Sequence, residues 1–195
     1  MKKTRVLVLL FLIGALSFVH AGPATAVWDS LYERWDVAFS LSGGLSYAFR
    51  PAAYPSIELI VLSVKIDEFM PVDFGVSARG LITRYKKSKD AEESGWLHAG
   101  IGVAATAHIS FNNLQTHSLP FMENFDFYIA CGPVYDIITY SGVYKSSPPP
   151  IPSNGMGITT AGGVRYFILD WFALNIEVFN WRFSPGLTAG LTFNF

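Results

Sequence analysis

The chain has 195 residues, of which 51% are hydrophobic and 15% aromatic, whereas only 15% are charged. Soluble domains carry about 25% charged residues, so this composition excludes a disordered chain and argues against an extensively hydrated surface. Fourteen basic residues nearly balance fifteen acidic ones, which leaves a net charge of −1 and no basic footprint for nucleic acid.

The first residues have the layout of a secretory signal peptide. Basic residues near the start precede an apolar run over residues 6–19, and small-residue cleavage patterns end at Ala21 and at Ala26. The apolar run is too short, and its flanks are wrong, for a membrane anchor. We therefore expect residues 1–26 to be removed on export, with cleavage after Ala21 as the alternative, and residues 27–34 to form a short periplasmic lead-in.

A period-two pattern begins after this leader and is clearest over residues 35–50. Odd positions carry mostly large apolar or aromatic side chains, and even positions carry mostly Ala, Ser or Gly. Because successive side chains of a strand point to opposite faces, the segment has one strongly apolar face and one face of small residues. The second face suits a cramped interior better than it suits the polar surface of a soluble sandwich.

Seven further segments repeat the alternation. The predicted strands cover residues 35–50, 56–67, 72–85, 96–111, 124–139, 157–168, 171–183 and 186–195. The second segment is the weakest, because two apolar series of opposite parity compete within it. Each segment can cross a bilayer as a tilted strand, and a lipid-exposed sheet cannot leave an open edge. The sequence therefore predicts an all-β fold, an eight-stranded antiparallel up-and-down transmembrane β-barrel over residues 35–195, with an interior that side chains can fill.

The predicted connections alternate between two sides of the barrel. With a periplasmic N-terminus, the extracellular loops are residues 51–55, 86–95, 141–154 and 183–185, and the periplasmic turns are residues 68–71, 112–123 and 169–170. The turn over 112–123 is long for its side. Pro133 falls within a strand, where a proline normally marks a bulge or a break. Tryptophans near strand ends, Trp96 and Trp181 among them, are expected in the aromatic girdles at the two membrane interfaces.

Two stretches carry a resemblance to known proteins. The end of the chain, residues 186–195, resembles the C-terminal signal of outer-membrane barrels, with Leu191 and Phe193 alternating toward a terminal Phe195. Residues 162–177 resemble the sixth strand, tight turn and seventh strand of the small OmpA/OmpX-type barrels. The resemblance implies a multi-pass location in the outer membrane of a diderm bacterium. It also implies insertion by the barrel-assembly machinery, which reads the last strand.

Strand parity places seven titratable side chains inside the barrel. They are Arg79 and Glu177 near mid-height, His108, Asp126 and Arg165 toward the periplasmic end, and His98 and Asp136 near the extracellular rim. Buried charges must be paired, and this set can pair internally. We interpret it as a polar network that fills the lumen, the alternative being a site or a conducting lumen.

Three functions remain open. The favoured one is a non-enzymatic surface-interaction protein with a mostly filled lumen, whose extracellular loops 86–95 and 141–154 meet a ligand or host partner. The second is a narrow channel for small or hydrophobic molecules, similar to the OmpW-like barrels of this size. It is favoured if glycines on the inner wall leave a gap, at Gly100, Gly102, Gly132 and Gly163.

The third function is a lipid-modifying enzyme at the extracellular rim. Its candidates are His98 and Asp136, with Ser94 and Ser141 not far off in the predicted barrel. The sequence contains no nucleophile elbow, phosphate loop or metal-ligand cluster, so we expect no cofactor and no metal. The predicted protein is a monomer that is surrounded by outer-membrane lipid.

Overall fold

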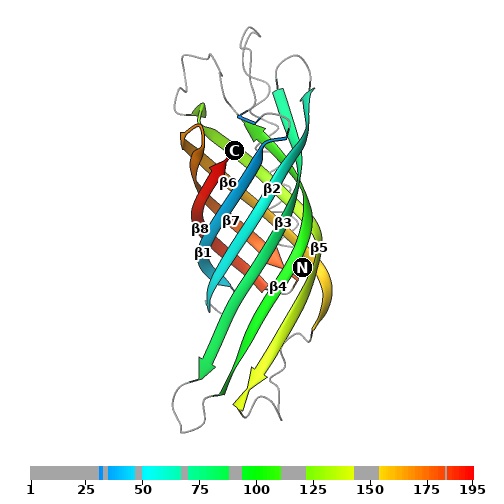
Figure 1. The fold of residues 1–195 in the computed structure, drawn as a ribbon, viewed down its shortest axis with the longest axis vertical. Coiled ribbons are helices and arrows are strands. Elements are labelled where there is room, and N and C mark those ends of the chain that lie inside the picture. Colours follow the sequence, from blue (N-terminus) through cyan, green and yellow to red (C-terminus); the bar gives the residue numbers. More distant parts are fainter. Residues whose placement is uncertain are drawn as a thin grey trace, which may run out of the picture.

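The structure is a computed structural model that describes residues 31–32, 35–46, 50–66, 70–87, 94–110, 122–142, 154–182 and 184–195. Its strands are β1 (Val37–Ser46), β2 (Arg50–Ile66), β3 (Met70–Lys87), β4 (Ser94–Ser110), β5 (Phe125–Ser141), β6 (Gly155–Leu169), β7 (Phe172–Trp181) and β8 (Ser184–Asn194). They form one closed barrel in sequence order (Figure 1), and neighbouring strands are antiparallel. The predicted eight-stranded antiparallel barrel is confirmed. Within the described residues, no helix is long and apolar enough to span a membrane.

The first and last strands close the barrel. Their register runs from Ala38 opposite Asn194 to Leu45 opposite Leu187. Just beyond it, the Val37 N–H donates to the Phe195 carbonyl at 3.0 Å, and the Phe195 N–H donates back at 2.9 Å. The start of β1 and the last residue therefore share one end of the barrel, which we call the terminal end. The opposite end, where β1 leads to β2 and β3 leads to β4, is called the loop end.

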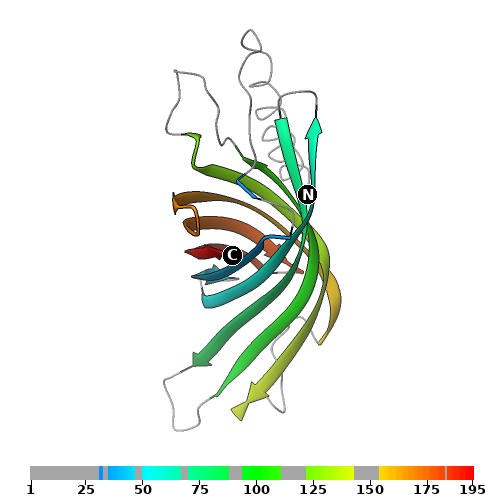
Figure 2. The same ribbon diagram turned by 45° about the horizontal axis from the view of Figure 1, so that its top comes forward.

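The rim of the loop end is uneven. Figures 1 and 2 both show β3, β4 and β5 projecting well beyond β1, β7 and β8 there. The difference follows from strand length, because β3 has 18 residues whereas β1 and β7 have 10 each. The predicted loops 86–95 and 141–154 therefore begin on the projecting strands, at the ends of β3 and β5.

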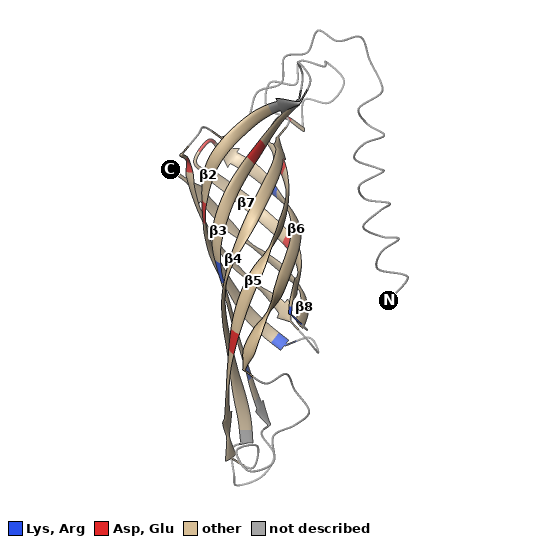
Figure 3. Ribbon diagram, turned by 90° about the vertical axis from the view of Figure 1, so that its right-hand side faces the viewer, with Lys and Arg blue, Asp and Glu red and all other residues tan. Residues whose placement is uncertain are grey.

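Alternating burial follows the period-two pattern of the sequence. In β7 the odd-numbered side chains from Ala173 to Trp181 are buried, and the even-numbered ones from Leu174 to Asn180 are exposed. Each of the eight strands carries large apolar side chains that are exposed, and Figure 3 shows how few charged residues lie along the strands. An apolar outer face and a mixed inner face are what a barrel in lipid requires.

The prediction of an extracellular loop over residues 51–55 is wrong. These residues belong to β2, which begins at Arg50 and pairs with β1 from Leu45 opposite Pro51 to Val37 opposite Leu59. Two prolines suggested a loop, because proline cannot donate to a strand ladder. The structure accommodates Pro55 by leaving Tyr54 and Pro55 without a paired position in β3.

The ambiguous pattern over 56–67 has a structural cause. The β2–β3 register shifts between Ile60 and Leu62, and a bulge inverts the parity of the residues that follow it. Up to Ile60 the even positions are buried, whereas Leu62 and Val64 are exposed. The bulge expected at Pro133 is absent, because the β4–β5 register is the same on both sides of that residue. The other predicted strands match the observed ones closely, except that β1 already ends at Ser46.

Candidate functional site: the barrel interior

All seven predicted interior residues are buried. Arg79, His98, His108, Asp126, Asp136, Arg165 and Glu177 are each at most 8% exposed. They fall into three groups that follow one another from the terminal end to the loop end, and the rings of Tyr128 and Tyr54 link each group to the next.

The group nearest the terminal end surrounds His108, on β4. Its Nδ1 lies 3.0 Å from Asp126 Oδ2 on β5, and its Nε2 lies 2.9 Å from Glu58 Oε1 on β2. The Arg165 guanidinium on β6 donates to Glu58 Oε2 at 2.7 Å. Carboxylates only accept hydrogen bonds, so both ring nitrogens of His108 must donate, which makes the imidazole cationic. Two carboxylates then balance two cations, which is the pairing that buried charges require.

Tyr32 completes this group from outside the strands. Its hydroxyl donates to Asp126 Oδ2 at 2.8 Å and accepts from Arg165 Nη1 at 2.7 Å. Burial raises the pKa of the Tyr32 phenol well above its ordinary value, so the hydroxyl keeps its proton and can donate. Residues 27–34 were expected to form only a lead-in, yet one of them is part of the lumen.

The mid-height group spans the lumen from one wall to the other. Arg79 on β3 forms an ion pair with Glu177 on β7, and these strands lie on opposite sides of the barrel. The Tyr128 hydroxyl donates to Glu177 Oε2 at 2.7 Å. The Tyr54 ring lies 5.3 Å from the Arg79 guanidinium carbon and stacks on Phe179 at 4.7 Å between ring centroids. Charged and aromatic side chains therefore fill the same cross-section.

The group at the loop end converges on Asp136, on β5. His98 Nε2 lies 3.0 Å from Asp136 Oδ1, the Trp181 indole N–H donates to the same oxygen at 2.7 Å, and Arg182 Nη1 lies 3.4 Å from Oδ2. Trp181 is fully buried and Trp96 is nearly so, so the expectation that both belong to outer aromatic girdles is wrong. The inward parity of these positions decides their placement, although both lie close to strand ends.

The rim-enzyme hypothesis needs a serine beside His98. Among the described side chains, the Ser141 hydroxyl donates instead to the Gly95 carbonyl at 3.2 Å, and the Ser94 side chain lies outside the described set. The Asp136 oxygens are taken up by Trp181, Arg182 and the histidine. The described geometry therefore places His98 beside Asp136 and brings no described serine to it.

The four glycines that were candidates for a gap face occupied space. A Cβ on Gly100 would lie 2.6 Å from the Trp181 indole nitrogen, and one on Gly163 would lie 2.6 Å from the Tyr128 ring. A Cβ on Gly102 would meet Val134 at 2.4 Å, and one on Gly132 would meet the β4 backbone at 1.9 Å. Glycine is thus used at these positions to admit close neighbours, not to leave an opening.

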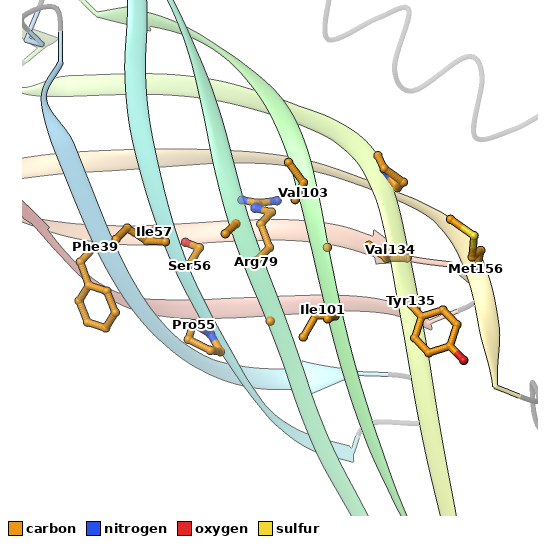
Figure 4. Close-up of a pocket in the computed structure, with 14 residues that line it drawn as sticks. Phe39, Pro55, Ser56, Ile57, Arg79, Ile101, Val103, Val134, Tyr135 and Met156 are labelled. Atoms are coloured by element: carbon orange, nitrogen blue, oxygen red, sulfur yellow. The ribbon is translucent and has the colours of Figure 1, made fainter.

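The outer wall of the barrel carries an apolar groove. A groove of about 590 Å³ crosses the outer wall from β1 to β6, and Figure 4 shows Phe39, Ile101, Tyr135 and Met156 along it. The groove is continuous with the exposed apolar belt, so it belongs to the outer face.

Among the described residues, no set of three or more His, Cys, Asp or Glu side chains could hold a metal ion.

The predicted assembly signal lies at the end of β8. Phe193 is half-buried and packs against Phe172 and Trp171, with centroid distances of 5.5 and 6.3 Å. Leu191 and Phe195 are exposed on the outside of the barrel. These three side chains therefore form a continuous apolar strip next to the seam that closes the barrel.

The sequence matches no family model and no curated protein sequence. Solved structures do resemble this barrel. Ail, the attachment invasion locus protein of Yersinia pestis in complex with the heparin analogue sucrose octasulfate, aligns with a TM-score of 0.51 and 9% identity over 82% of this chain and 97% of its own. The outer membrane enzyme PagL aligns with a TM-score of 0.50 and 7% identity over 80% of this chain and 98% of its own.

This chain has the fold of the small outer-membrane β-barrels. At such low identity the likeness shows the fold alone. The two neighbours are an attachment protein and an enzyme, so this fold carries more than one function. What this barrel does must be argued from its own interior and its own loops.

Proposed function

We propose that the protein is an integral outer-membrane barrel with a filled lumen, and that it acts at the cell surface as an anchored interaction protein. The observation that carries this proposal is the mid-height group. The Arg79–Glu177 ion pair, with the Tyr54 and Tyr128 rings beside it, crosses the lumen of a barrel whose four candidate gap glycines face occupied space. Eight strands leave an interior just wide enough for side chains. An interior crossed at mid-height by these side chains favours a scaffold over a transport path.

The interacting part is assigned to the loop end. With the terminal end in the periplasm, the projecting ends of β3 and β5, which loops 86–95 and 141–154 follow in the sequence, face the outside. Loop 86–95 holds three lysines and three acidic residues, so it is well hydrated and nearly neutral. Loop 141–154 contains the run Pro148–Pro150, and a polyproline segment is semi-rigid. A stiff segment attached to a fixed scaffold is suited to presenting one constant shape to an extracellular ligand or host partner.

The remaining parts of the proposal concern the surroundings. We assign recognition by the barrel-assembly machinery to the apolar strip that ends at Phe195. The protein is a monomer, and its apolar outer face contacts outer-membrane lipid. No enzymatic role is proposed, because the described Ser141 hydroxyl is bonded to the Gly95 carbonyl instead of to His98. The leader over residues 1–26 lies outside the described residues and stays a prediction.

The loop assignment can be tested with the barrel refolded in lipid vesicles. Three forms are compared: the intact chain, a form with residues 87–93 shortened, and a form with residues 143–153 shortened. Vesicle binding is measured on immobilised heparin, the polymer that the sucrose octasulfate bound to Ail imitates, and on surfaces coated with extracellular-matrix protein. The proposal expects binding to one surface that is lost when a loop is shortened while the barrel stays folded. Binding that is unchanged in both shortened forms would contradict it.

A further inference from the structure

The chain turns sharply just before β1. Trp35 has a φ of 82°, a left-handed conformation that is unusual for a residue other than glycine and must be held by its surroundings. Two backbone hydrogen bonds hold it here. The Trp35 N–H donates to the Ile60 carbonyl at 2.8 Å, and the Ile60 N–H donates to the Asp36 carbonyl at 3.0 Å. The turn is thus fastened to β2 at the position of the bulge, and Tyr32, three residues earlier, is buried inside the barrel with only 3% of its surface exposed.

Tyr32 occupies a pocket with two kinds of wall. The polar wall is formed by Asp126, which accepts from the phenol at 2.8 Å, and by Arg165, which donates to it at 2.7 Å. The flat walls are rings, since His108 and Phe167 meet the Tyr32 ring edge-on at centroid distances of 5.2 and 5.9 Å. Strands β4, β5 and β6 therefore all contribute to the pocket.

An apolar base completes the enclosure. Ile60, Phe167 and Ala173 form one buried cluster with Tyr32, and Leu31 packs against that cluster. A phenol is the side chain that fits all of these features, because it offers a flat ring, one donor and one acceptor in a single group. A phenylalanine would fill the space but leave Asp126 and Arg165 each with one partner fewer, and buried charged groups tolerate this poorly.

We propose that the terminal end of the barrel contains a phenol-binding pocket whose ligand is Tyr32 of the same chain. The segment before β1 is thereby latched into the lumen and covers the His108–Asp126–Arg165 group. Both expected cleavage positions precede Tyr32, so either mature form retains the latch. The proposal goes beyond the surface role, because a conducting barrel or a barrel with inert loops could carry the same latch.

The test uses the full mature barrel refolded in lipid, with Tyr32→Gly as the main variant. This variant removes the ring and hydroxyl together and opens a space the size of p-cresol, which is the tyrosine side chain itself. We expect the thermal unfolding midpoint of the variant to fall and to recover on addition of p-cresol. Toluene, which lacks the hydroxyl, should bind at least about tenfold more weakly, as expected for hydrogen bonds to charged partners. The intact chain should not respond to p-cresol, because its pocket is occupied.

Two controls define the outcome. Tyr135→Phe removes a hydroxyl from a tyrosine that is 44% exposed on the outer face and should change nothing. An unchanged midpoint in Tyr32→Gly, or equal binding of p-cresol and toluene, would overturn the latch. If Tyr32→Gly does not fold, Tyr32→Phe decides: amide exchange of residues 31–36 should accelerate at least about tenfold, and equal rates would overturn the proposal. None of these readouts involves ion conduction or loop binding, so they fail or succeed independently of the proposed function.

Discussion

Arg79 on β3 and Glu177 on β7 form an ion pair between opposite walls of the barrel, with both side chains buried. A pair in this position ties together strands that share no backbone hydrogen bonds. Its two charges are far from water, so each depends on the other for compensation. The pair therefore bears on two properties of the barrel, its stability and the proposed filling of its lumen.

The first prediction concerns this pair. Arg79→Leu or Glu177→Leu alone leaves an uncompensated buried charge and should lower the free energy of unfolding by about 3–5 kcal/mol. The double variant should be less destabilised than either single variant, because it leaves no charge behind. Urea unfolding in lipid vesicles measures all three. Additive losses would show that the two side chains act independently and would contradict the prediction. The control is Asp170→Asn, at the exposed β6–β7 turn, which should change the free energy of unfolding little.

The second prediction concerns pH and Tyr32. Burial raises the pKa of its phenol above the unfolded value of about 10, so the folded state favours the neutral form. The stability that this hydroxyl contributes is complete below about pH 10 and is lost as the pH rises further, because the unfolded chain then releases the proton first. The difference in unfolding midpoint between the intact chain and Tyr32→Phe should therefore stay constant up to about pH 9 and shrink as the pH rises from about pH 10 to about pH 11. A difference that stays constant between about pH 10 and about pH 11 would contradict this account.

The third prediction concerns assembly. Deleting Phe195 removes the apparent signal residue and the two backbone hydrogen bonds that it exchanges with Val37 at the closing seam. We expect less folded, heat-modifiable protein in the outer membrane, while export across the inner membrane stays intact. Fractionation and gel mobility before and after heating measure both. Phe195→Tyr keeps an aromatic end and should assemble normally, whereas full assembly of the deletion would argue against a recognition role.

The fourth prediction concerns the outer face. Val103 on β4 is 52% exposed at a predicted midplane position, and a lysine there should cost about 2–4 kcal/mol in lipid. Met156, 73% exposed near the loop end at the start of β6, should tolerate lysine at a cost of about 0–1 kcal/mol, because the penalty falls toward the interface. Equal costs at the two positions would mean that the outer face is not immersed as proposed.

Much of this architecture was predictable because a barrel strand has a strict period of two. That period indicated eight strands and placed residues as distant as Asp126 and Arg165 on the inner face, where the register sets them opposite each other. It could not give contacts between strands that are not neighbours. The contact between Arg79 and Glu177 depends on how the barrel closes and on the stagger of its strands, and neither can be read from a single segment of the sequence.

Glu58, Trp181 and Tyr32 are among the interior residues that escaped the sequence analysis, each for a different physical reason. Glu58 lies just before the β2 bulge, where two competing apolar series concealed its inward parity. Trp181 lies at a strand end, and its inward parity was outweighed by the usual place of tryptophan at membrane interfaces. Tyr32 precedes the periodic pattern altogether, so only the tertiary pocket that receives it determines its position.

The filled lumen is the central claim, and single-channel recording in planar bilayers tests it most directly. The refolded intact barrel, and a form with loops 86–95 and 141–154 shortened, are each inserted and recorded under applied voltage. Because the Arg79–Glu177 pair and its aromatic neighbours occupy the lumen at mid-height, we predict no reproducible conductance steps in either form. Steps that appear in the intact barrel and vanish when Arg79 or Glu177 is replaced would contradict the claim and identify the protein as a channel.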